Sequence, residues 1–119
     1  MNPLETVKKL NQIILGGTGE GLEAIVTDDI VFKGPLFKAS GKEEFIPGFM
    51  RWIQTKKTYN VGKEIVDGNT VCSFYEITIE TPAGPVTIDS ADMMEVRDGK
   101  ISNIHVYFDP RELLKATGR

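Results

Sequence analysis

One carboxylic acid in the second half of the chain shares a strand face with apolar side chains. From Val86 to Val96 the residues alternate in character, and the face that carries valine, isoleucine and methionine also carries Asp92. Burial there disfavours the ionised form, so Asp92 should hold its proton more tightly than an aspartate in water. We therefore predict a neutral acid that can donate a hydrogen bond. A structural role, in which Asp92 only accepts hydrogen bonds within the core, is an equally open interpretation.

Tyr75 is the second candidate for chemistry. The strand before Asp92 also alternates, and Tyr75 belongs to its apolar face. Counting back across the turn at residues 82–83 predicts two cross-strand pairs, Ser73 with Asp92 and Tyr75 with Ser90. The phenol would then assist the acid or orient a ligand. The alternative is that its ring only packs, as tyrosines on strands commonly do.

A set of apolar and small polar residues is predicted to form a pocket around this pair. A water-poor cavity strengthens the hydrogen bonds made inside it, which favours acid chemistry. The expected pocket residues are Phe32, Phe49, Trp52, Ser73, Ser90, Met94, Ile104, Val106 and Phe108.

The first half of the chain is expected to be mainly helical. Asn2 caps a helix that has Pro3 at its first position, and a glycine pair ends that helix at residues 16–17. A short second helix is expected at residues 20–26, a brief strand at 30–32, a loop through 40–41 and a third helix at 42–55.

The second half changes to a period of two, which is typical of strands. Turn residues separate its segments, and the strongest hairpin signal is Asp98-Gly99. The strands are expected at about 58–66, 70–80, 85–97 and 100–108, followed by a terminal helix capped by Asp109. Helices before an antiparallel meander predict one α+β domain over residues 1–119, with the helices on one face of the sheet.

Composition excludes several classes of protein. The net charge of −3 argues against a nucleic-acid surface. One cysteine, Cys72, and one histidine, His105, supply neither a disulfide nor a zinc site. The sequence shows no secretory signal and no membrane-spanning run, so a cytoplasmic protein is expected. His105 falls on the polar face of the last strand and is expected to be exposed or at a dimer interface, away from the pocket.

Two stretches resemble the SnoaL-like branch of the nuclear transport factor 2-like superfamily. They are Val31-Phe32-Lys33-Gly34-Pro35 leading to Gly41-Lys42-Glu43, and Asp98-Gly99-Lys100-Ile101 leading to Tyr107-Phe108-Asp109. The order of the elements agrees with that branch along essentially the whole chain. The resemblance implies a cone-shaped, curved antiparallel sheet whose concave face and N-terminal helices enclose a pocket for a small apolar molecule. It also implies a homodimer through the sheet face.

Ketosteroid isomerase, a relative in that superfamily, offers one match and two departures. Asp92 matches the protonated aspartate of its oxyanion hole, whereas its general base falls on Gly34 here and its oxyanion tyrosine has no counterpart in the first helix. Residues 104–109 are similar to the closing strand of limonene-epoxide hydrolase, but Val106 replaces the catalytic aspartate. That enzyme would place Glu76 inward, which makes Glu76 the alternative to Tyr75.

Two functions therefore stay open. The first is a SnoaL-like enzyme of the isomerase or cyclase type, acting without cofactor or metal on an apolar carbonyl or polyketide-like substrate, with Asp92 as the acid. The second is a ligand-binding or dimeric accessory domain that has kept the pocket and lost the base, which Gly34 and Val106 favour.

Overall fold

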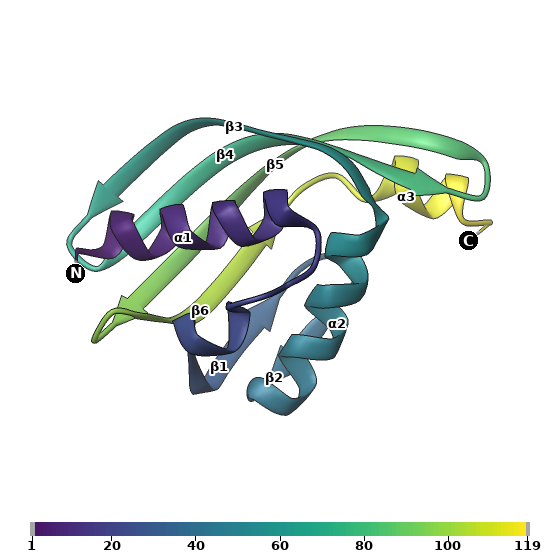
Figure 1. The fold of residues 1–119 in the computed structure, drawn as a ribbon. Helices are drawn as coiled ribbons and strands as arrows, with labels where there is room; N and C mark the ends of the chain where they lie inside the picture. The colour runs from purple at the N-terminus through teal and green to yellow at the C-terminus, as the bar shows by residue number, and fades with distance from the viewer. Residues whose placement is uncertain (1, 119) are drawn as a thin grey trace.

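A curved sheet of six strands forms the frame of the molecule, in the order β2-β1-β6-β5-β4-β3 (Figure 1). The computed structural model describes residues 2–118. The helices are α1 (Pro3–Gly16), the 3₁₀ turn η1 (Leu22–Ile25), α2 (Lys42–Thr55) and α3 (Arg111–Ala116). The strands are β1 (Val26–Lys33), β2 (Lys38–Ser40), β3 (Lys56–Asp67), β4 (Thr70–Thr81), β5 (Gly84–Arg97) and β6 (Lys100–Tyr107). The α+β class is confirmed.

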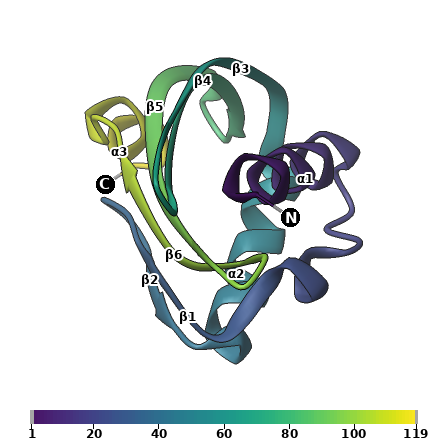
Figure 2. The same cartoon turned by 90° about the vertical axis from the view of Figure 1, so that its left-hand side faces the viewer.

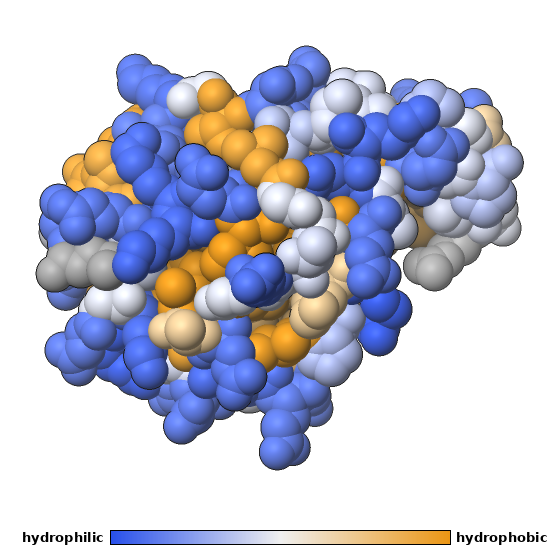
Figure 3. Space-filling view, in the orientation of Figure 1, coloured by the Kyte–Doolittle hydropathy of each residue, from blue (hydrophilic) through white to orange (hydrophobic). Residues whose placement is uncertain are grey.

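The sheet curves without closing, and α1 and α2 lie on its concave side (Figure 2). α1 packs against β3, β4, β5 and β6, whereas α2 packs against β1, β2 and β4. The inner face of the sheet is therefore shared between two helices. Figure 3 shows the side of the molecule that α1 and α2 form, with an apolar area at its centre and hydrophilic side chains around it.

The four-strand meander has the predicted pairing. Across the turn at residues 82–83, Ser73 lies opposite Asp92 and Tyr75 opposite Ser90, which confirms both expected pairs. The turn between β5 and β6 has positive φ at both central residues, 53° at Asp98 and 78° at Gly99. Positive φ at both positions suits the twist of a two-residue hairpin.

One strand pair is parallel, which corrects the expectation of a purely antiparallel sheet. β1 runs beside β6 in the same direction, with Phe32 opposite Ile104. The alternation within each strand identifies its buried face, but it contains no information about which distant strand lies beside it. This pairing joins the first strand of the chain to the last.

The sequence prediction placed several N-terminal boundaries wrongly. The expected second helix is only a 3₁₀ turn, because Val26 already belongs to β1, which is much longer than the predicted residues 30–32. The expected loop through residues 40–41 contains the short edge strand β2, whose Ala39 pairs with Phe32. Three residues are too few for an alternation pattern to show.

Both long helices begin and end for local reasons. The side chain of Asn2 accepts the backbone N–H of Glu5 at 2.9 Å, and Gly17 ends α1 with a φ of 77°. At the start of α2 the carboxylate of Glu44 reaches back to the backbone N–H of Ser40 at 2.9 Å. Pro47 lies inside α2, which continues without interruption.

The start of α3 differs from the predicted cap. Pro110 occupies the N-cap position, so Asp109 lies one residue before it. Asp109 still accepts the backbone N–H of Arg111 at 3.0 Å and pairs with its guanidinium at 2.6 Å. Within residues 2–118, no helix is both long enough and apolar enough to cross a membrane.

Candidate functional site

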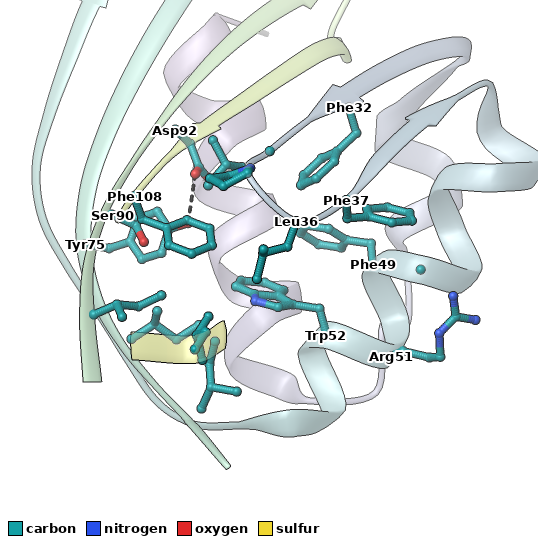
Figure 4. Close-up of a pocket in the computed structure, with 18 residues that line it drawn as sticks. Phe32, Leu36, Phe37, Phe49, Arg51, Trp52, Tyr75, Ser90, Asp92 and Phe108 are labelled. Carbon is teal, nitrogen blue, oxygen red and sulfur yellow. Dashed lines mark hydrogen bonds between the residues drawn. The ribbon is translucent and has the colours of Figure 1, made fainter. Parts of the chain in front are cut away.

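A cavity of about 250 Å³ lies between the inner face of the sheet and α2 (Figure 4). The loop at residues 34–37 and the end of the chain near α3 complete its walls. The residues around it are mostly apolar, and they are Phe32, Gly34, Pro35, Leu36, Phe37, Gly48, Phe49, Arg51, Trp52, Tyr75, Ile77, Ile79, Ile88, Ser90, Asp92, Val106, Phe108 and Leu113.

Most of the residues expected around a pocket do surround this cavity. Asp92 and Tyr75 line it, together with Phe32, Phe49, Trp52, Ser90, Val106 and Phe108. Both polar residues are buried, with 6% of each exposed, and Glu76 points outward on the other face of β4. The roles of these residues in binding or catalysis remain predictions.

Three of the expected residues lie elsewhere in the core. Ser73, Met94 and Ile104 are fully buried and do not line the cavity. The hydroxyl of Ser73 donates instead to the carboxylate of Glu64 at 2.8 Å. Alternation identifies the inner face of each strand, but that face continues beyond the cavity to the part of the sheet that α1 covers.

The loop at residues 34–37 was the main part of the wall that sequence analysis missed. Leu36 and Phe37 are 41% and 36% exposed, yet both line the cavity. The backbone N–H of Gly34 donates to the carbonyl of Phe37 at 2.9 Å and closes the loop. Two large apolar residues directly after Gly34-Pro35 were the available signal, because an exposed loop seldom carries such a pair without a partner.

Gly48 explains how the ring of Phe37 reaches α2. A Cβ at position 48 would lie 2.3 Å from Cζ of Phe37, so only glycine leaves room for the ring. The ring therefore lies directly against the backbone of α2 and forms part of the cavity wall. Gly48 and Phe37 are thus a matched pair at the edge of the site.

Asp92 and Tyr75 form the polar centre of the cavity. The Tyr75 hydroxyl donates to Oδ1 of Asp92 at 2.8 Å. Burial raises the pKa of Asp92 to about 7, even though the hydrogen bond from Tyr75 lowers it. The shift has the predicted direction. Burial, together with the nearby charge of Asp92, also holds the pKa of the Tyr75 phenol far above its usual range.

Asp92 has a second carboxyl oxygen, Oδ2, beside the one that accepts from Tyr75. Tyr75 is the hydrogen-bond partner of the carboxyl group, and it occupies Oδ1. Because burial raises its pKa, Asp92 keeps its proton to a higher pH than an ordinary aspartate does. A proton on Oδ2 of an acid that lines the cavity can be donated to an acceptor atom of a bound molecule.

A polar cluster behind the cavity fixes the position of Tyr75. The rings of Tyr59 and Tyr75 lie 5.2 Å apart, and the Tyr59 hydroxyl donates to Oδ1 of Asn11 at 3.1 Å. The amide of Asn11 donates in turn to Glu64 at 3.1 Å. Burial would raise the pKa of Glu64, but hydrogen bonds from Ser73 and Asn11 outweigh it and lower that pKa. The cluster ties α1 to β3 and β4.

The lining residues offer few other groups for chemistry. Arg51 is the remaining ionisable side chain among them, and it lies at the edge of the view in Figure 4, far from Asp92. No group of three or more His, Cys, Asp and Glu side chains within residues 2–118 could hold a metal ion. His105 lies outside the cavity, half-buried, with its ring stacked on Tyr107 at 4.0 Å.

The fold and the cavity together define the class of protein. The curved, unclosed sheet with helices on its concave side is a fold shared with a solved nuclear transport factor 2-like protein. The chain belongs to the SnoaL-like domain family, whose model matches residues 7–104. A comparison with curated protein sequences finds no significant match.

Solved structures with the same fold include proteins of several kinds. A nuclear transport factor 2-like protein of unknown function from Cytophaga hutchinsonii is 24% identical, with 96% of each chain covered and a TM-score of 0.79. A protein from Jannaschia assigned to the SnoaL-like polyketide cyclases is 17% identical, with 97% of this chain and 90% of that chain covered and a TM-score of 0.81. A steroid delta-isomerase from Pseudomonas aeruginosa is 19% identical, with 98% and 86% covered and a TM-score of 0.81.

Proposed function

We propose that this protein is an isomerase- or cyclase-type enzyme that activates a small apolar carbonyl compound with Asp92 as the acid. The observation that supports this proposal most is the 2.8 Å hydrogen bond from Tyr75 to a buried aspartate on the wall of an apolar cavity. An acid in such a place is costly for stability, and groups with strongly shifted pKa values concentrate at functional sites.

The proposed chemistry begins with a hydrogen bond to the carbonyl oxygen. Neutral Asp92 donates from Oδ2, and this bond strengthens as negative charge develops on the oxygen in the enolate-like transition state. Tyr75 donates to Oδ1 and holds the carboxyl group in place. Within the described residues the cavity lining contains no other carboxylate and no imidazole, so the α-proton passes to a water molecule, and a proton returns from that water to carbon as the carbonyl re-forms. Proton transfer of this kind needs no cofactor.

A non-catalytic binding domain of the same fold is the second candidate. It is favoured by the cavity wall, where Gly34 and Val106 both lie. The sequence resemblance implies that ketosteroid isomerase has its general base at the first of these positions, and that limonene-epoxide hydrolase has its catalytic aspartate at the second. In that case Asp92 orients a ligand through one hydrogen bond, and the cavity serves for recognition alone.

Exchange of α-protons with solvent separates the two candidates. Tetralone in D₂O is followed by proton NMR with and without the protein. Under the enzyme proposal the protein accelerates loss of the α-proton signals, and Asp92→Asn lowers that acceleration by roughly a hundredfold, because the amide is a weaker donor. Asp89→Asn is the matched control, since Asp89 is exposed on the opposite face of the same strand.

The outcomes have separate meanings. Acceleration that Asp92→Asn abolishes and Asp89→Asn retains supports the enzyme. Binding of tetralone without any exchange above the buffer rate contradicts the enzyme and supports the binding domain. Equal exchange in all three proteins would show that Asp92 is not the acid.

A further inference from the structure

The cavity is a slot between two unlike walls (Figure 4). One wall is aromatic: the ring centroids of Phe49 and Trp52 lie 5.1 Å apart, and Phe32 meets Phe49 edge-on at 6.1 Å. The opposite wall is the inner face of the sheet, where Tyr75 and Ser90 lie beside Phe108 and aliphatic side chains (Figure 4). A flat molecule fills such a slot well, because one of its faces can stack on the aromatic rings.

The size of the cavity limits the ligand. An apolar cavity of about 150 Å³ takes up benzene. At the same packing, the cavity of about 250 Å³ holds a ligand of roughly ten non-hydrogen atoms. Sites for drug-sized ligands are larger, at roughly 300 to 1,000 Å³. One or two fused rings match this volume, whereas the tetracyclic skeleton of a steroid exceeds it.

Phe37 sets this limit on the open side. Its ring is held against α2 by the absence of a side chain at Gly48, and its loop is closed by the hydrogen bond from Gly34. Because Phe37 is 36% exposed, it contributes a wall without being part of the core. Its removal should enlarge the site and leave the fold intact.

We infer that the ligand of this site is a flat, conjugated carbonyl compound of one or two rings, with its oxygen at Asp92 and a ring face against Phe49 and Trp52. Compounds with steroid-like skeletons are excluded by size, with Phe37 as the residue that excludes them. The inference rests on the proposed function for the contact between the carbonyl oxygen and Asp92.

Trp52 provides the measurement. It is the only tryptophan of the chain and it lines the cavity, so its fluorescence reports binding there. The protein is titrated with tetralone, with its hydrocarbon analogue tetralin, with the tricyclic ketone anthrone and with the steroid androstenedione, and N-acetyltryptophanamide corrects for light absorption by the ligands. We expect tetralone to bind at least about tenfold more tightly than anthrone or the steroid.

Phe37→Ala tests the size limit directly. The variant should gain affinity for anthrone by about tenfold relative to the original protein. Phe74→Ala is the matched control, because Phe74 is also an exposed phenylalanine, at 42%, but lies on the outer face of the sheet. It should leave the order of affinities unchanged.

Each outcome separates this inference from the function on which it rests. If the steroid binds more tightly than tetralone and Asp92→Asn abolishes that binding, the size limit is wrong and the role of Asp92 as the ligand's partner stands. Equal binding of tetralone and tetralin contradicts the contact with Asp92 while the size limit stands. If none of the compounds changes the fluorescence, both proposals are wrong.

Discussion

Replacing Asp92 with asparagine should stabilise the protein at neutral and alkaline pH. The folded-state pKa is about 7, compared with an ordinary value of 3.8. Since the folded state binds this proton more tightly than the unfolded state, the Asp92 contribution is fully favourable below about pH 4 and is lost as the pH rises to about 7. A difference of about 3 in pKa corresponds to about 4 kcal/mol of unfolding free energy.

Asparagine resembles the neutral acid in shape and cannot ionise. Its carbonyl oxygen can still accept the hydrogen bond from Tyr75. The variant and the original protein should therefore be about equally stable near pH 4, and the variant should be more stable near pH 8 by up to about 4 kcal/mol. That is a large part of the stability of an ordinary domain, which is roughly 5 to 15 kcal/mol.

Urea denaturation at a series of pH values measures the difference. The fluorescence of Trp52 reports unfolding, and Asp89→Asn controls for the loss of one negative charge. The opposite result would be a loss of unfolding free energy in Asp92→Asn that is larger near pH 8 than near pH 4. That result would mean that the carboxylate is ionised and well paired in the folded state. Asp92 would then not be a neutral buried acid, and the proposed mechanism would be wrong.

Three further substitutions test other parts of the structure. Tyr75→Phe removes the hydrogen bond that lowers the pKa of Asp92, so carbon NMR of the carboxyl group should show that pKa rise above about 7, and a fall would contradict the pairing. Gly48→Ala should displace the ring of Phe37 and so weaken the quenching of Trp52 fluorescence by a bound ligand. The unfolding free energy should change little, because alanine favours a helix over glycine by about 1 kcal/mol. Phe74→Lys should convert the expected homodimer into monomers in light scattering, and a monomeric original protein would make that expectation wrong.

The outer face of the sheet is the surface that the dimer prediction concerns. Phe74 lies opposite Ala91, which lies opposite Tyr107, so these side chains form a row across three strands. Phe74 is 42% exposed and Tyr107 is 50% exposed. The homodimer remains a prediction, and this row is the part of the surface where a substitution tests it.

Local sequence was sufficient to predict the polar centre of the site. Alternation identified the face of Asp92 and Tyr75, and the turn at residues 82–83 set their register. The same two rules are short-range, so they could not show where the cavity ends along a strand. Ser73, Met94 and Ile104 were misplaced for this reason: they share the inner face but lie outside the cavity.

The features missed from the sequence depend on contacts between distant segments. The parallel pairing of β1 with β6 and the short strand β2 leave no periodic trace. The cavity wall formed by Phe37 depends on Gly48, a glycine inside a helix that offers no local signal of its partner. Pairs of this kind become visible only when the two segments are placed side by side.

The parallel pairing of β1 and β6 has a consequence for how the protein is made. During synthesis β1 and α2 leave the ribosome long before β6, the only long strand beside β1. The hairpins from β3 to β6 are local and can form early, whereas β1 must wait for the end of the chain. Until then α2 can cover only β1 and β2, and the edge of β1 that later pairs with β6 is open to wrong partners, a state that favours aggregation.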